Sequence, residues 1–206
     1  MSDILNKIIN YLNNNQLDKA MSLCKENKEK KNEHVIANIK GVILFKQQKY
    51  EQAKVEFLNS IDLDQKFLDP HKNLFRSYMK LEDFKSAIES GKRVIQLEIK
   101  KNSLSYYNLA LAYDFNKDYK KAIELYKIVE TFDFKEKKIL FNNLAACYFK
   151  YNEILEAKNY YQKALEFDQN DKVILNNLLI LYLRIGEKDK SEYFYKKAKA
   201  VDENYI

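Results

Sequence analysis

The chain has 206 residues, of which 46% are hydrophobic and 32% are charged, and its formal net charge is +6. Its 3 glycines and single proline argue against flexible linkers and against the glycine-rich loops that hold phosphate groups. Apolar residues never run for the roughly 18 positions that a membrane-spanning helix needs, so we expect no membrane insertion.

The N-terminal stretch 1–15 predicts an amphipathic helix. Asp3 and Lys7 interrupt its apolar residues, and it lacks the basic start and apolar run of a secretion signal. The two cysteines, Cys24 and Cys147, both fall in predicted helices far apart in the sequence. We expect them to be reduced thiols in the core, which is typical of a cytoplasmic protein.

Six helical hairpins follow one another along the sequence. The second helix of each carries a small residue that recurs every 33 to 35 positions: Ala20, Ala53, Ala87, Ala122, Ala157 and Ser191. Nine positions earlier, the first helix carries an aromatic residue or leucine: Tyr11, Leu44, Tyr78, Tyr113, Tyr148 and Tyr182. These registers place repeats at about 1–33, 34–67, 68–102, 103–137, 138–171 and 172–206. We interpret residues 1–206 as a single array.

The third hairpin departs from its neighbours in two ways. Phe75 occupies a position that is small in the adjacent first helices, and Gly91 replaces the usual ring of the second helix. This pattern suggests that the large side chain lies on the first helix of this hairpin and the small residue on the second, the reverse of the neighbouring hairpins. Pro70 follows Asp69 at a predicted helix start, where a capping aspartate and a first-turn proline both fit.

The fourth hairpin, near 103–130, shows the pattern most clearly. Apolar side chains recur at the spacing of one helix face in both halves: Tyr106, Leu109, Ala110 and Tyr113, then Tyr119, Ala122, Ile123, Tyr126 and Val129. Asn116, Lys117 and Asp118 break the pattern between the halves, and Asp118 is a candidate N-cap. Because one hairpin cannot bury both of its faces, it needs copies stacked beside it.

Several segments resemble the tetratricopeptide repeat family, whose motif has a period of 34 residues. The matching segments are YNLALAY at 107–113, YKKAIELY at 119–126, NNLAACY at 142–148 and NNLLILY at 176–182. The family's tryptophan is replaced, for example by His71, and its closing proline is absent. The resemblance covers the chain and implies an all-α, right-handed superhelix of about twelve antiparallel helices.

In this family the first helices line a concave groove, and one register of that wall is rich in asparagine here. The six residues are Asn6, Ile39, Asn73, Asn108, Asn143 and Asn177. This register looks like the asparagine ladder in the repeat domain of O-linked N-acetylglucosamine transferase. An asparagine amide can pair with both the N–H and the C=O of a passing peptide. The peptide-binding residues implied in this way are Asn73, Asn108, Asn143 and Asn177, with Lys72, Arg76, Tyr107, Asn142 and Asn176 as neighbours. Alternatively, the asparagines are shared because the repeats were copied from one ancestor.

The leading interpretation is a non-enzymatic interaction scaffold that binds an extended protein or peptide segment in its groove. The alternative is a segment that recruits substrates for a larger enzyme such as a glycosyltransferase. The family's clamp for two carboxylates does not fit, because residues such as Arg76, Ile139 and Asn143 differ from those it requires. Lys72 and Arg76 still suit one acidic group on the ligand.

No catalytic, metal or cofactor site is indicated. The only histidines, His34 and His71, have no cysteine or histidine at metal-ligand spacing, and no nucleophile–histidine–acid arrangement is visible. The lysine-rich runs at 25–32 and 135–138 are mixed with glutamate, and arginine is scarce. We interpret them as solvated loops and expect no nucleic-acid binding.

The last predicted helix, near 188–201, carries apolar residues that include Tyr193 and Tyr195. Arrays of this kind often close with a more polar helix, and none follows in this sequence. Three explanations stay open: the native chain continues, a partner or a second copy covers this edge, or its exposure is tolerated. The second includes self-association through the C-terminal helix.

Overall fold

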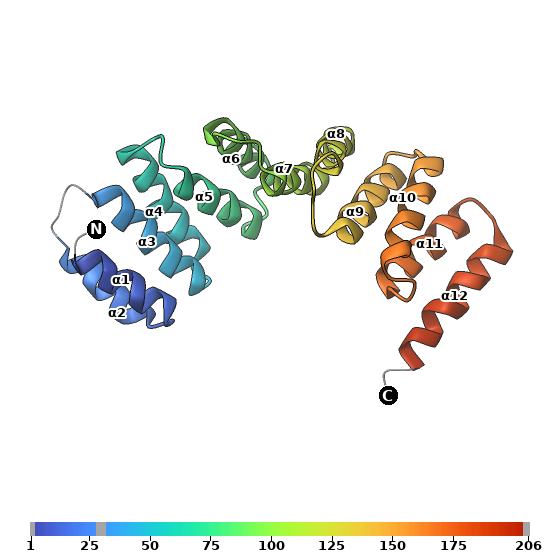
Figure 1. Cartoon of the computed structure of the whole chain (residues 1–206), viewed down its shortest axis with the longest axis horizontal. Helices are drawn as coiled ribbons and strands as arrows, with labels where there is room; N and C mark the ends of the chain where they lie inside the picture. The colour runs from blue at the N-terminus through green and yellow to red at the C-terminus, as the bar shows by residue number, and fades with distance from the viewer. Residues whose placement is uncertain (1–2, 28–31, 204–206) are drawn as a thin grey trace. The chain divides into compact units, whose positions relative to one another are not determined.

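The structure, a computed structural model, describes residues 3–27 and 32–203, in which the regular elements are twelve α-helices and no strand (Figure 1). The helices are α1 (Asp3–Asn13), α2 (Leu17–Glu26), α3 (Glu33–Lys46), α4 (Tyr50–Leu63), α5 (Leu68–Lys80), α6 (Phe84–Leu97), α7 (Ser103–Phe115), α8 (Tyr119–Glu130), α9 (Lys137–Lys150), α10 (Ile154–Phe167), α11 (Lys172–Arg184) and α12 (Lys188–Glu203). The predicted all-α repeat fold is confirmed. Residues 28–31 of the lysine-rich run 25–32 lie outside the described residues, as do residues 204–206.

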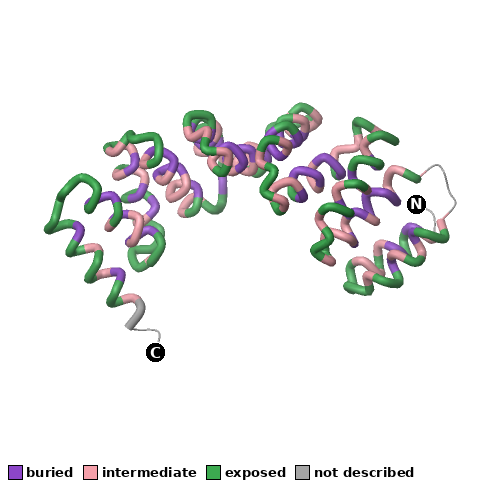
Figure 2. The backbone as a smooth tube through the Cα atoms, turned by 180° about the vertical axis from the view of Figure 1, so that it is seen from behind, coloured by how far each residue is buried: buried purple, intermediate pink, exposed green. Residues whose placement is uncertain are grey.

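The chain forms two compact units of three hairpins each. The first is Met1–Lys101 with α1–α6, and the second is Asn102–Ile206 with α7–α12. Within each unit, the helices of a hairpin pack on each other, and each second helix packs on the first helix of the next hairpin. Buried positions lie where the helices of a unit face one another (Figure 2). The interpretation of both units as a single array stays a prediction.

The small residue of each second helix lies in the core, as predicted. The five alanines of this register are fully buried and Ser191 is nearly so. The two helices of a hairpin come very close: a Cβ atom added to Gly41 in α3 would lie 2.4 Å from Cε1 of Phe57 in α4. In the third hairpin the same two registers hold Phe75 and Gly91, and both are buried. This arrangement is consistent with the predicted reversal of the large and small residues.

Two predictions about helix starts had different outcomes. Asp118 caps α8, because its carboxylate accepts a hydrogen bond from the Lys121 backbone N–H at 3.3 Å. Asp69 does not cap α5: the N-cap is Phe67, and the helix already includes Leu68. That prediction was wrong, although Pro70 does lie in the first turn.

All six hairpin turns share one backbone geometry. Each places one residue in the left-handed region, with φ between 55° and 77°: Asn15, Gln48, Glu82, Lys117, Asn152 and Gly186. In the fourth hairpin, the N–H of Lys117 donates to the C=O of Asp114 and the N–H of Asp118 donates to the C=O of Tyr113, both at 2.9 Å. The other five turns repeat these two bonds at the corresponding positions. This pair of bonds defines the Schellman motif, which satisfies carbonyl groups at a helix end.

Left-handed backbone is unfavourable for residues with a Cβ, by about 1–2 kcal/mol. Only one of the six turn residues, Gly186, is glycine. Asn15 and Asn152 belong to the residue type that adopts this conformation more readily than most. The remaining turns, at Gln48, Glu82 and Lys117, are therefore places where glycine would relieve strain.

We predict that Lys117→Gly raises the free energy of unfolding by about 0.5–1 kcal/mol, because relief of the left-handed strain outweighs the greater entropy of glycine in the unfolded chain. Gly186→Ala should lower it by about 1 kcal/mol for the converse reason. Urea unfolding followed by circular dichroism measures both. The matched control is Lys120→Gly, within α8, which should lower stability by about 1 kcal/mol. Equal losses for Lys117→Gly and Lys120→Gly would contradict the strain argument.

Candidate binding surface

The asparagine register of the sequence lies on the first helix of each hairpin. We call it the ladder position: Asn6, Ile39, Asn73, Asn108, Asn143 and Asn177 on α1, α3, α5, α7, α9 and α11. Ile39 is buried in the core, Asn6 is exposed, and the other four are half-buried. The residue before each of them is the preceding position, which includes Asn38, Lys72, Tyr107, Asn142 and Asn176.

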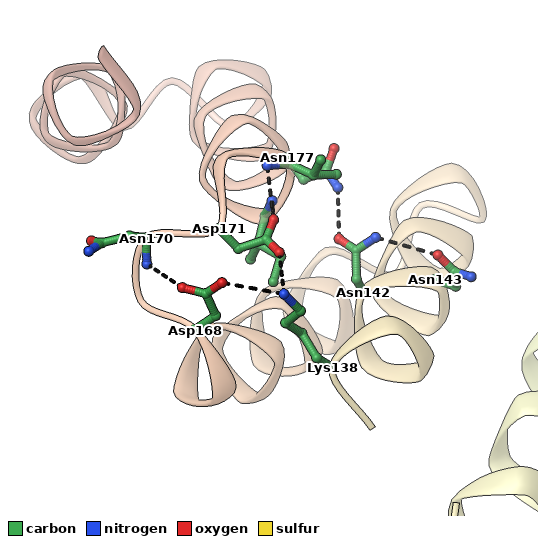
Figure 3. A network of polar contacts seen from close by, with 9 residues as sticks. Lys138, Asn142, Asn143, Asp168, Asn170, Asp171 and Asn177 are labelled. Atoms are coloured by element: carbon green, nitrogen blue, oxygen red, sulfur yellow. Dashed lines mark hydrogen bonds and ion pairs between the residues drawn. The ribbon is translucent and has the colours of Figure 1, made fainter. Parts of the chain in front are cut away.

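Three ladder asparagines donate a hydrogen bond to the preceding position of the previous hairpin. The Nδ2 of Asn177 donates to the Oδ1 of Asn142 at 2.9 Å, as Figure 3 shows. The Nδ2 of Asn143 donates to the hydroxyl of Tyr107, also at 2.9 Å. In the first unit, the corresponding bond joins Asn73 to Asn38 at 3.0 Å. We call these bonds inter-repeat clasps, because each joins two first helices.

The clasps leave hydrogen-bonding groups available at the same residues. An asparagine amide has two N–H donors and an oxygen with two lone pairs, and a clasp uses only one donor. The Oδ1 of Asn143 accepts a further, longer bond from Asn142 at 3.4 Å. Within the described part of the second unit, residues 102–203, the side chains of Asn108 and Asn176 have no hydrogen-bond partner. Asn108 and Asn176 are therefore the predicted site residues of this unit whose side chains no hydrogen bond to the protein explains.

Tyr107 anchors its clasp through its ring. The ring stacks on Phe134 with centroids 5.1 Å apart and lies 5.6 Å from the ring of Tyr126. Burial raises the pKa of Tyr107, so its hydroxyl stays protonated near neutral pH and can both donate and accept. Tyr107 is thus a structural partner of the ladder as well as a predicted ligand contact.

The two predicted cationic residues lie in the first unit and already have partners. Lys72 forms an ion pair at 3.0 Å with Glu98, whose side chain is almost fully buried. The guanidinium of Arg76 lies 4.9 Å from the centroid of the Phe45 ring. Arg76 remains exposed, so it is the more accessible of the two charges for an acidic ligand group.

A polar network joins α9 to the start of α11 (Figure 3). The ammonium group of Lys138 lies 2.7 Å from a carboxylate oxygen of Asp171 and 3.3 Å from one of Asp168. Asp171 also caps α11 by accepting from the backbone N–H groups of Val173 and Ile174. Burial raises the pKa of Asp171, but the bonds from Lys138 and the helix N–H groups outweigh it and lower that pKa overall. The network therefore places one cation against two carboxylates.

A shallow pocket of about 150 Å³ adjoins this network. It is lined by Lys138, Ile139, Asn142, Asp171, Val173 and Ile174. The sequence-based site included only one of these residues, Asn142.

The structure gives no support for a metal or nucleophile site in the described residues. They hold no cluster of three or more histidine, cysteine, aspartate or glutamate side chains that could bind a metal ion. His71 is buried with its Nε2 3.1 Å from the carbonyl of Gln65, and burial lowers its pKa. Cys24 and Cys147 are buried and do not form a disulfide, and burial raises the pKa of Cys24 to about 11. Thiols in such surroundings are poor nucleophiles.

Comparison with known proteins identifies the repeats and the fold. A family model described as Tetratricopeptide repeat matches residues 104–128 and 140–171. None of the curated protein sequences compared with the chain matches it. Among the described residues, no helix has the length and apolar character required to cross a bilayer.

Solved structures with the same fold share little sequence with this chain. MamA is 19% identical, with 84% of this chain and 93% of that chain covered and a TM-score of 0.76. YrrB, described as a TPR protein with an unusual peptide-binding site, is 15% identical, with 92% and 93% covered and a TM-score of 0.71. The C-terminal part of a TPR repeat-containing protein from Cytophaga hutchinsonii is 21% identical, with 95% and 81% covered and a TM-score of 0.74. The chain therefore has the same fold as these tetratricopeptide repeat proteins.

We predict that Tyr107→Phe and Asn143→Ala each lower the free energy of unfolding by about 1 kcal/mol, because each removes one partner of the same clasp. The double variant should cost little more than either single change, so the coupling energy should also be about 1 kcal/mol. Asn108→Ala should leave stability unchanged and should be additive with Tyr107→Phe. Urea unfolding of the five variants measures all of these values. Simple additivity of Tyr107→Phe and Asn143→Ala would show that the clasp contributes nothing.

Proposed function

We propose that this protein is a non-enzymatic interaction scaffold that holds an extended segment of another protein against its ladder asparagines. The proposal rests on the shared position of the ladder asparagines in the second unit. Asn108, Asn143 and Asn177 occupy one position on three successive first helices of the second unit, and each retains unused hydrogen-bonding groups. The tetratricopeptide repeats of this unit support a binding role, since such folds commonly present peptide-binding surfaces.

The spacing of the ladder suits a polypeptide in extended conformation. Packed helices lie about 8–10 Å apart. An extended peptide advances about 3.3 Å per residue, so one asparagine meets about every third residue of the ligand. At each contact, an amide can donate to a carbonyl and accept from an N–H of the peptide backbone. Such contacts secure the course of the ligand and leave sequence selection to neighbouring side chains.

We expect the triple variant Asn108→Ala, Asn143→Ala and Asn177→Ala to bind at least about tenfold more weakly, since each lost hydrogen bond contributes about 0.5–1.5 kcal/mol. The probes are fluorescent synthetic peptides selected from a random display library against the wild-type chain, and their affinities come from anisotropy titrations. Asn159→Ala, on the exposed surface of α10, is the matched control and should leave affinity unchanged. Circular dichroism confirms that helicity is retained. Undiminished affinity of the triple variant would refute the ladder as a binding surface.

A second copy of the chain is the partner that we propose for α12. In inner hairpins, the ring four residues after the small residue is covered: Tyr126 and Tyr161 are 0% and 2% exposed, whereas Tyr195 at the same register is 55% exposed. Tyr193 and Leu183 are exposed nearby. Because α12 also presents charges of both signs, two antiparallel copies can pair their opposite charges while covering these rings.

Multi-angle light scattering tests this self-association directly. We expect a mass twice that of one chain at high protein concentration, and the mass of one chain for the double variant Tyr193→Glu and Tyr195→Glu. The charged side chains would be too costly to bury in a paired surface. A monomeric wild-type chain at every concentration would rule out the second copy as the partner.

A further inference from the structure

An exposed aliphatic row accompanies the ladder in the second unit. Four residues before the ladder asparagines lie Leu104, Ile139 and Val173, which are 54%, 47% and 61% exposed. Residues four apart share one helix face, so this row lies one turn from the ladder on α7, α9 and α11. In the first unit the same register holds a half-buried Val35 and an exposed Asp69. Single exposed aliphatic residues are ordinary, but a row repeated in three successive hairpins beside unused amides is not scattered.

Two members of this row form a pocket together. Ile139 and Val173 line the pocket between α9 and α11, with the buried Ile174 as a further apolar wall. The volume is about 150 Å³. Apolar cavities of about this size accept a ligand as large as benzene, so the pocket has room for one aliphatic side chain.

The charges at the rim select against an acidic ligand group. Lys138 contacts both Asp168 and Asp171, so its single positive charge faces two negative ones (Figure 3). The cluster of Lys138, Asp168 and Asp171 beside the pocket therefore carries one more negative than positive charge. A glutamate or aspartate entering the pocket would meet this charge while losing water, and both effects are unfavourable.

A backbone contact is available beside the apolar walls. Asn142 lines the pocket and accepts the clasp from Asn177, which lies on the next first helix (Figure 3). Only one N–H of Asn177 is used in that clasp, and its other N–H can reach a ligand carbonyl. An apolar anchor and a main-chain hydrogen bond can therefore act on adjacent groups of one peptide.

We infer that this pocket binds an aliphatic side chain of the extended segment and rejects acidic ones, which makes it the main determinant of ligand sequence. The inference rests on the proposed function, since it specifies the ligand of the same surface. The ligand class is an extended peptide with leucine, isoleucine, valine or methionine at one position and no acidic residue beside it. Of the two cations considered from the sequence for an acidic ligand group, Arg76 in the first unit is the exposed one, and it lies outside this pocket.

The test uses the full chain and the fluorescent peptides selected from the random display library. Ile139→Ser with Val173→Ser should weaken binding at least tenfold while leaving helicity unchanged, because both residues are on the surface. The control is Leu155→Ser, an exposed aliphatic residue on α10 of the same unit, which should leave affinity unchanged. On the peptide side, replacing the aliphatic anchor with aspartate should abolish binding, whereas exchange among leucine, isoleucine and methionine should change it less than threefold.

Removal of one negative charge beside the pocket provides an independent test. Asp168→Asn removes one carboxylate from Lys138 and leaves the helix cap Asp171 in place. It should improve the affinity of peptides with glutamate next to the anchor by at least threefold and leave the parent peptides unchanged. If neither the serine double variant nor Asp168→Asn changes the affinity of the peptides, the assignment of the pocket is wrong.

The two proposals fail in distinguishable ways. If Asn108→Ala weakens binding but the pocket variants do not, the ladder binds peptides and the pocket does not select them. If neither affects binding, or if the library yields no binder, both proposals are wrong.

Discussion

Close contact between the two helices of each hairpin is the constraint on which the rest of the structure depends. The fully buried alanines and the missing space at Gly41 show that this contact needs small residues, and where Phe75 occupies the register of Gly41, Gly91 occupies the register of Phe57. With the two helices held at one separation, each hairpin repeats the geometry of the last, and equivalent residues of successive first helices come within hydrogen-bonding distance. The clasps between Asn177 and Asn142, and between Asn143 and Tyr107, result from this repetition.

A structural role and a binding role can coexist in one asparagine. The clasp fixes the plane of the amide, so the remaining N–H and oxygen point in defined directions before any ligand arrives. A ligand then binds groups whose rotamer freedom has already been lost, which lowers the entropic cost of association. The clasp therefore explains how the orientation of these amides is maintained. Asn108 forms no clasp within the described part of its unit, so its amide is not fixed in this way.

The hairpins could be predicted from the sequence because a period of about 34 residues marks each one. The residue type and position of Asp118 were also enough to predict that it caps α8. The same reasoning was insufficient for Asp69: proline lacks an N–H and fits several first-turn positions, so Pro70 did not determine which residue caps α5. The clasps were missed because their partners lie about 35 residues apart and become visible only when two registers are read together. The pocket was missed because the pattern of a single hairpin does not show which aliphatic residues, such as Val173, remain uncovered.

The hairpin turns have a consequence for how this architecture diverges. Their reversal is encoded by two main-chain hydrogen bonds, and Gln48, Glu82 and Lys117 perform it where glycine would be expected. A turn built in this way forms without glycine in five of the six hairpins, at a cost of about 1–2 kcal/mol for each residue with a Cβ, so its course does not depend on one side chain. Solved structures that are only 15% and 21% identical to this chain have the same fold over 92% and 95% of it. The two hydrogen bonds therefore keep the reversal the same in hairpins of this chain whose turn residues differ.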